Sequence, residues 1–343
     1  MVNKNFNYSK RTTFLMKKFN IRIIFLLAPL FLLWTCSEYF YRNIPNNYTL
    51  KKQYIEQHSN YIEVLLFGNS HCFYGLNPKY FSKKTFNFSN SSQTIYFDKL
   101  LFDQYFDKLP QLKQVVFCIE YMNLSQKDNT KDDVWLKYYY QQYMNLEVPI
   151  VSMFDLRKHS LSLTQSLFKT SASIFRYYEN KTLINCNPDG WSFNHKKINS
   201  TPPEKNAKQR ASIHEDGSIN FLKNLERIRA IIDVCEKRNI QLVIISMPQS
   251  KSYTSYLNKE KLQLIFSNCK NLENFNKNSV YYLNLFKDNR FIDEDFFDAD
   301  HLNDNGAKKC SQILNEFLNK ITVEPKDQNT NVNQHSTRNY LRH

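Results

Sequence analysis

A serine follows a short apolar run near the start of the chain, in the stretch Val64-Leu-Leu-Phe-Gly-Asn-Ser-His-Cys-Phe-Tyr-Gly75. This stretch holds two of the five glycines among 343 residues, Gly68 and Gly75. A serine placed between a buried strand and a helix or turn is presented at the edge of a sheet, with backbone N–H groups around it. Ser70 can therefore act as a nucleophile if a base reaches it.

A base and an acid that could serve this serine occur far along the chain, in Phe297-Asp-Ala-Asp-His-Leu-Asn-Asp-Asn-Gly-Ala307. Asp298 and His301 are close enough in sequence for one tight turn, on which the carboxylate accepts the imidazole Nδ1–H and Nε2 points outward. The spacing predicts a nucleophile, base and orienting acid, with Asp300 and Asp295 as alternative acids. Adjacent residues on a turn diverge, so His71 is expected to point away from the site.

The elements that must position these residues follow an alternating pattern. Five short apolar runs are typical of buried parallel strands, at residues 62–67, 85–88, 114–119, 241–246 and 280–285. Amphipathic stretches predict helices over residues 96–109, 221–238 and 305–321, the last with Asp304 as its candidate N-cap. The alternation predicts an α/β fold, a three-layer α/β/α sandwich with a mostly parallel five-stranded sheet.

The alternation stops between about residues 124 and 220, a region rich in Tyr, Phe, Asn and Gln. It is too long for an ordinary loop. We interpret it as an inserted, partly helical cap over the carboxyl ends of the strands, where open α/β sheets bind ligands. Its aromatic side chains either form the core of the cap or stack on a sugar. Residues 323–343 are polar and Asn/Gln-rich, which predicts a disordered tail.

Residues 1–37 have the pattern of an export signal, with six basic residues and no acid up to Arg22, then the apolar run 23–33. The run is short for a span of ~20 residues, but residues 14–16 and Trp34 can extend it into a signal anchor. Cleavage, or acylation of Cys36 as in a lipoprotein, are the alternatives, beside a buried core helix with a basic tail. The positive-inside rule then predicts that residues 38–322 lie outside the cytoplasm, in the periplasm or at the cell surface.

Composition excludes several function classes. Of the net charge of +14, six charges lie in residues 1–22, and the remaining bases and acids are interspersed, so that nucleic-acid binding is not predicted. Five glycines cannot build a Gly-rich nucleotide loop. Seven scattered cysteines without a C-x-x-C pair predict neither a metal nor a cofactor. The histidines outside the two blocks also form no carboxylate cluster that predicts a metal site; they are His58, His159, His195, His214, His335 and His343.

The two end blocks resemble those of the SGNH (GDSL-type) hydrolase superfamily, in which the catalytic Ser follows the first strand and the last block reads Asp-x-x-His. The resemblance extends over about residues 62–318 and implies Ser70 as nucleophile, His301 as general base and Asp298 as the acid that orients it. The middle blocks depart from the family. Besides the Ser70 N–H, the implied oxyanion donors are Ser92, at the place of the family's Gly, and one of Asn90, Gln93 and Asn123, because Met122 replaces the family's Asn.

Membrane-anchored domains of this kind resemble those that act in O-acetylation and D-alanylation of bacterial surface polymers. The resemblance implies extracytoplasmic ester chemistry through an acyl-Ser70 intermediate, with O-acyl (acetyl) transfer to a cell-surface polysaccharide as the expected function. A carbohydrate esterase or deacetylase, and a catalytically decayed glycan-binding or assembly protein, are the alternatives. The implied partners are a glycan or other ester substrate, the membrane, and a multi-span membrane acyltransferase.

Overall fold

The computed structural model describes residues 3–129, 133–275 and 279–323. Of the predicted tail, Val323 ends helix α11 (Asp304–Val323), and residues 324–343 lie outside the described residues. The described chain forms two compact units. We call Met1–Asn46 with Pro149–Leu183 the anchor unit, and Asn47–Val148 with Ile184–His343 the sheet unit. Each unit is described by itself.

The sheet unit is built on five parallel strands in the order β2-β1-β3-β4-β5. Each strand lies inside one of the predicted apolar runs, so the predicted α/β fold with a five-stranded sheet is confirmed. The strands are β1 (Val64–Phe67), β2 (Thr85–Asn87), β3 (Gln114–Cys118), β4 (Gln241–Ser246) and β5 (Val280–Asn284).

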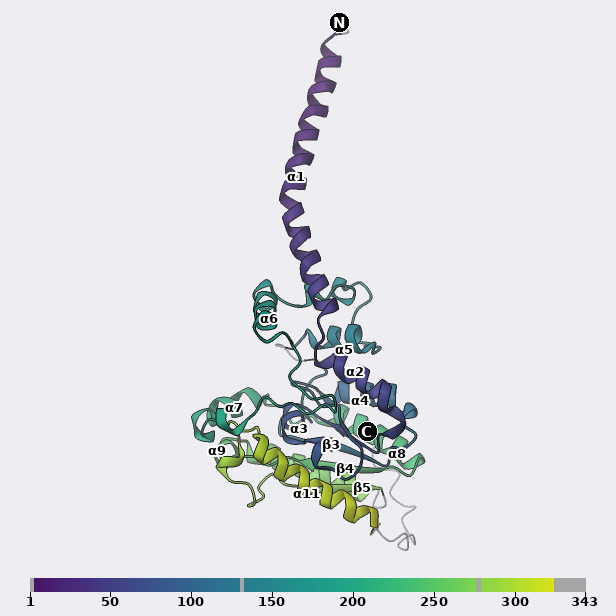
Figure 1. The fold of residues 1–343 in the computed structure, drawn as a ribbon, viewed down its shortest axis with the longest axis vertical. Helices are drawn as coiled ribbons and strands as arrows, with labels where there is room; N and C mark the ends of the chain where they lie inside the picture. The colour runs from purple at the N-terminus through teal and green to yellow at the C-terminus, as the bar shows by residue number, and fades with distance from the viewer. Residues whose placement is uncertain (1–2, 130–132, 276–278, 324–343) are drawn as a thin grey trace. The chain divides into compact units, whose positions relative to one another are not determined.

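Helices cover both faces of this sheet, and accordingly apolar residues on both faces dominate its central strands. On one face, Val64 and Leu66 belong to a core shared with helices α3 (Ser70–Gly75) and α11 (Asp304–Val323). The yellow helix α11 runs along this face in Figure 1. On the other face, the Phe67 ring lies 6.3 Å from that of Phe102 on helix α4. Helices α4 (Ile95–Tyr105) and α8 (Leu222–Lys237) pack together there.

The three predicted helices form, with shifted ends. The predicted helix 96–109 becomes α4 followed by a 3-10 turn, Phe106–Lys108. Asn303, and not Asp304 as predicted, caps α11: its Oδ1 accepts from Asn305 N and Gly306 N at 3.0 Å each. Asp304 instead accepts from Lys197 N at 2.8 Å. The other helices are α2 (Asn47–His58), α5 (Leu136–Met144), α6 (Leu167–Asn180), α7 (Ala207–His214), α9 (Lys251–Thr254) and α10 (Lys259–Phe275).

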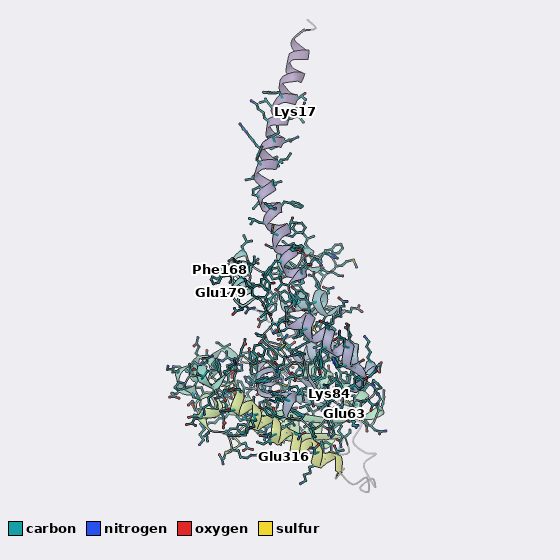
Figure 2. The ribbon with its side chains drawn as sticks, in the orientation of Figure 1. Lys17, Glu63, Lys84, Phe168, Glu179 and Glu316 are labelled. Atoms are coloured by element: carbon teal, nitrogen blue, oxygen red, sulfur yellow. The ribbon has the colours of Figure 1, made fainter. Side chains whose placement is uncertain are left out.

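Glu63 joins the amino ends of three neighbouring strands. Its carboxylate accepts from Lys84 N at 3.1 Å, ahead of β2, and from Lys113 Nζ at 2.6 Å, ahead of β3. Glu63 and Lys84 are labelled in the lower part of Figure 2. This end of the sheet is opposite the carboxyl end at which Ser70 lies, so its contacts stabilise the sheet and take no part in the candidate site.

The anchor unit contains α1 (Asn3–Asn43), a continuous helix with Pro29 inside it. Helix α1 is long and apolar enough to cross a membrane, a test that an N-terminal signal sequence also passes. None of its most apolar window is buried, which disfavours the alternative of a core helix. Residues Pro149–Leu183 belong to this unit, so the region predicted as one cap is divided between the two units.

Candidate active site

The turn between β1 and α3 presents Ser70 at the carboxyl end of β1. Gly68 begins this turn with φ +149°, and a Cβ on it would lie 2.8 Å from the Cβ of Cys118, so a larger residue does not fit. Asn69 then caps α3, because its Oδ1 accepts from His71 N at 3.0 Å. Ser70, half-buried, is the first residue of the helix.

The structure brings together the three residues that the sequence predicts as nucleophile, base and acid. His301 Nε2 lies 2.9 Å from Ser70 Oγ, and His301 Nδ1 lies 3.1 Å from each carboxylate oxygen of Asp298. Asp298 Oδ1 also accepts from His301 N at 2.9 Å, so that the acid fixes both the backbone and the ring of the histidine. An Nδ1–H donated to Asp298 leaves the Nε2 lone pair facing the Ser70 hydroxyl.

The acid of this arrangement stays ionised. Burial acts to raise the pKa of Asp298, but the hydrogen bonds and charge of His301 outweigh it and hold that pKa below its usual value. An ionised Asp298 accepts the Nδ1–H and can stabilise the imidazolium that forms when His301 takes a proton.

His71 does not point away from the site, and this prediction is wrong. Its ring is buried 5.0 Å from that of His301, with Nε2 3.0 Å from Asp300 Oδ2 and Nδ1 3.2 Å from Glu120 Oε2. Burial acts to lower the pKa of His71, but the two carboxylates raise it to about 9. His71 is therefore an imidazolium held between two acids at neutral pH.

Asp300, an alternative acid in the sequence, faces this second histidine. It also receives a two-pronged bond from Arg210, at 2.7 Å from Nε and 2.8 Å from Nη2. Burial opposes its ionisation, yet His301, His71 and Arg210 hold the pKa of Asp300 well below its usual range. Its carboxylate lies 3.7 Å from His301 Nδ1, farther than that of Asp298. Asp300 therefore contributes a negative charge near His301, whereas Asp298 is the acid that orients the His301 ring.

Asp295, the other alternative acid, has a structural role. Its carboxylate accepts from Ile292 N at 3.0 Å and pairs with Lys309. These bonds fix the loop that leads to Asp298 and α11.

Two of the predicted oxyanion donors are already used within the protein. The Asn123 amide donates to Cys118 O at 2.8 Å, and its oxygen accepts from Glu120 N at 2.8 Å. The Gln93 amide donates to Asp98 Oδ1 at 2.5 Å. Both side chains hold loops at the carboxyl ends of strands, which disfavours them as donors to a substrate.

The remaining predicted donors lie on two turns that touch. Asn90 N donates to Gly68 O at 3.4 Å, which joins the turn after β2 to the turn before Ser70. Ser92 has a left-handed backbone, φ 57°, in the same turn. Asn69 Nδ2, next to Ser70 in the sequence and not singled out there, is a buried donor for which the described residues offer no hydrogen-bond partner. The backbone N–H of Ser70 completes this set, because the first N–H groups of a helix have no partner inside it.

A stack of three rings lies beside His301. The His195 ring lies between Tyr74 and Phe297, with centroid separations of 3.5 Å and 4.0 Å, and 5.2 Å from the His301 ring. Burial, helped by the charge of His301, lowers the pKa of His195 to about 3, so the ring is neutral. Trp191 in the same segment donates to Tyr74 O at 2.7 Å. The part of the predicted cap that belongs to the sheet unit therefore packs directly beside the candidate site.

Buried histidines and carboxylates gather beside the candidate triad, among them His214, one of the histidines that were predicted to form no metal-binding cluster. One ligand atom each from His71, Asp300 and His301 lies within 4.8 Å of the others, and His214 Nδ1 lies 3.7 Å from Asp300. The set does not suit a cation as it stands, because Arg210 and His71 already neutralise Asp300, and a protonated imidazole cannot bind a metal. The cluster is a network of balanced buried charges.

The sequence position of one of these residues already indicates its place in the site. Glu120 follows the carboxyl end of β3, the strand beside β1, so its position predicted a carboxylate at the same sheet edge as Ser70. Arg210 and His195 lie in the region without strand and helix alternation. Their approach to Asp300 and His301 depends on tertiary packing alone.

Comparisons with known proteins give no family for the whole chain. A model of an uncharacterised protein family matches residues 195–323, which include Asp298 and His301. No curated protein matches the chain.

Two solved structures resemble the chain at low similarity. One, from Streptococcus pneumonia and provisionally described as a platelet activating factor, has a TM-score of 0.39 and 10% identity, over 86% of this chain and 98% of its own. The other, a provisionally assigned acylhydrolase from Bacteroides fragilis, has a TM-score of 0.37 and 11% identity, over 78% of this chain and 95% of its own. At these TM-scores the likeness supports no conclusion about function.

Proposed function

We propose that the protein is a serine-dependent enzyme that transfers an acyl group from an ester through an acyl-Ser70 intermediate. One observation carries the proposal: Ser70 Oγ, His301 Nε2 and the Asp298 carboxylate form a continuous hydrogen-bonded chain, with separations of 2.9 Å and 3.1 Å. These are the distances required of a nucleophile, its base and the group that orients the base. Ser70 and His301 are 231 residues apart in the sequence, so local turn geometry alone does not explain their contact.

The reaction has two steps. Ser70 Oγ attacks the carbonyl carbon of the donor ester while its proton passes to His301 Nε2, and the proton then goes to the departing alkoxide as the ester bond breaks. The hydroxyl of the acceptor next gives its proton to His301 and attacks the acyl carbon. Ser70 leaves and recovers that proton. The N–H groups of Ser70 and Ser92 and the amide of Asn90 are the proposed donors to the oxyanion.

The proposed acceptor is a sugar hydroxyl of a cell-surface polysaccharide, outside the cytoplasm, with acetyl as the acyl group. The apolar helix α1 supports a membrane location, and the neutral stack of Tyr74, His195 and Phe297 gives the site an apolar, aromatic wall. We propose a multi-span membrane acyltransferase as the partner that supplies the acyl group. If water is the acceptor, the same residues make the protein a carbohydrate esterase.

Intact mass tests the first step. The full chain in detergent is exposed to p-nitrophenyl acetate, beside a Ser70→Ala variant and a Ser82→Ala control on the exposed surface. We expect one added acetyl group in the parent and the control, and none in Ser70→Ala. Absence of the adduct from a folded parent would refute the proposed nucleophile and favour a glycan-binding protein. Addition of oligosaccharide to the acylated protein then distinguishes transfer, seen as an acetylated sugar, from hydrolysis.

A further inference from the structure

The segment 149–183 of the anchor unit exposes many large apolar side chains. The Phe154 side chain is 92% exposed and that of Phe168 is 82% exposed. Both belong to a larger group of exposed apolar residues on this segment. Large apolar side chains that remain exposed together on one segment of a folded protein indicate a contact site. The group consists of Met153, Phe154, Leu156, Leu163, Leu167, Phe168, Ile174, Phe175 and Tyr178.

Helix α6 divides its residues between two sides. One side faces α1: Tyr41 OH lies 3.1 Å from Thr170 Oγ1, and the Tyr177 ring lies 5.9 Å from Phe40. With about 100° between successive residues, Phe168 lies on the opposite side. The exposed apolar residues of α6 occupy that outer side and one flank, and the exposed Glu179 lies near the C-terminal end of the outer side. Lys169 and Arg176 lie on the other flank. Phe168 is labelled on α6 in Figure 2.

The segment is attached to α1 at the place where the apolar helix becomes polar. Trp34 Nε1 donates to Ser160 Oγ at 2.9 Å, and the Glu38 carboxylate accepts from Ser160 Oγ at 2.8 Å and from Ser162 N at 3.0 Å. A bilayer core of ~30 Å requires ~20 helical residues. The span predicted from the sequence ends at Trp34, which is the residue that donates to Ser160. The segment is therefore held at the boundary between hydrocarbon and water.

We propose that segment 149–183 lies in the membrane interface, with the outer side of α6 and the exposed residues of the preceding loop in contact with lipid. An interfacial helix carries apolar residues toward the acyl chains and basic residues toward the head groups. The segment has five basic residues against two acids, a balance that suits anionic head groups. Its continuity with the apolar span of α1 makes the bilayer the nearest apolar phase. This contact is independent of the proposed acyl transfer.

Spin labels on the full chain test the proposal. Among the seven cysteines only Cys36 is exposed, so a Cys36→Ser parent has no reactive surface thiol. In this parent we label Phe168→Cys and Phe175→Cys, and as matched controls Lys169→Cys and Arg176→Cys, each one residue farther along the helix. The proteins are reconstituted in vesicles of phosphatidylethanolamine and phosphatidylglycerol. Collision rates are measured with oxygen, which concentrates in lipid, and with a nickel chelate, which stays in water.

We expect the ratio of oxygen to nickel collisions to be several-fold higher at positions 168 and 175 than at 169 and 176. Equal access of nickel to all four positions would overturn the proposal. Protection of positions 168 and 175 from both reagents would also overturn it, because a protein surface, such as a second copy of the chain, would then cover α6. A Phe168→Trp variant in a Trp34→Phe background gives a second measurement: brominated lipid is expected to quench more fluorescence in this variant than in the same background with Phe168 retained, where only Trp135 and Trp191 emit.

Discussion

His71 makes the stability of the sheet unit depend on pH in a defined direction. The pKa of His71 is about 9 in the folded protein, against 6.5 in an unfolded chain. A raised pKa contributes stability that is complete below pH 6.5 and is lost as the pH rises through 9. The full contribution is about 3 kcal/mol, of which ~2 kcal/mol is lost between pH 7.5 and 9.5. We expect a His71→Gln variant to lack this loss.

The assay compares the two proteins across that interval. Guanidinium unfolding of the full chain in detergent is followed by tryptophan fluorescence at pH 7.5, 8.5 and 9.5, with Trp34→Phe in every protein so that the signal comes from the sheet unit. Other titrations, such as that of Lys51, whose pKa burial lowers to about 8, are common to both proteins and cancel in the difference. His58→Gln, at the last residue of α2, is the matched control. Its unfolding free energy is expected to change with pH as that of the parent does.

Removal of His71 also leaves Glu120 and Asp300 without the cation between them. An unpaired buried charge costs about 3–5 kcal/mol, so His71→Gln is expected to be less stable than the parent at pH 7.5 and closer to it at pH 9.5. Parallel pH profiles of parent and variant would refute the assignment of a buried imidazolium. A parent whose stability rises from pH 7.5 to 9.5 relative to His71→Gln would do the same.

Three further predictions concern the candidate site. Asp298→Asn keeps the shape of the acid but favours the wrong tautomer of His301, so the rate of acyl transfer to Ser70 should fall ~10⁴-fold. The control Asp295→Asn should lower the stability of the protein without a comparable loss of rate. Gly68→Ala places a Cβ 2.8 Å from that of Cys118, so it should lower the unfolding free energy more than Gly217→Ala, where the Cβ meets nothing within 4 Å. Equal unfolding free energies of the two variants would contradict the steric argument. Asn303→Ala removes the cap of α11 and should cost about 1–2 kcal/mol, measured by the same unfolding assay, while Asp304→Ala should cost less.

Part of this site was predictable because some of its contacts are between residues close in sequence, and others follow from the order of the strands and helices along the chain. The three-residue spacing of Asp298 and His301 allows their side chains to bond within one turn. The strand before Ser70 determines that Ser70 lies at the carboxyl edge of the sheet. Parallel strands place their carboxyl ends together, so a serine after β1 and a histidine before the last helix can meet without further information. The apolar runs were equally readable, because both faces of a parallel sheet are buried.

Other features depended on packing between distant residues. The direction of His71 follows from Glu120 and Asp300, which stand in other loops and outweigh the tendency of turn neighbours to diverge. The cap of α11 is Asn303 because its side chain also donates to Glu294 O at 2.8 Å.

The region 124–220 shows the same limit most clearly. Composition predicts an insertion there, but the division of the region between the two units depends on contacts of residues 149–183 with α1 that no local pattern contains. The sequence by itself determined the sheet, the order of its strands along the chain and the three residues of the proposed triad, since these depend on short-range spacing and strand burial. Only the tertiary structure decided the buried charge network and the placement of α6 against α1, because both depend on contacts between residues that are far apart in the sequence.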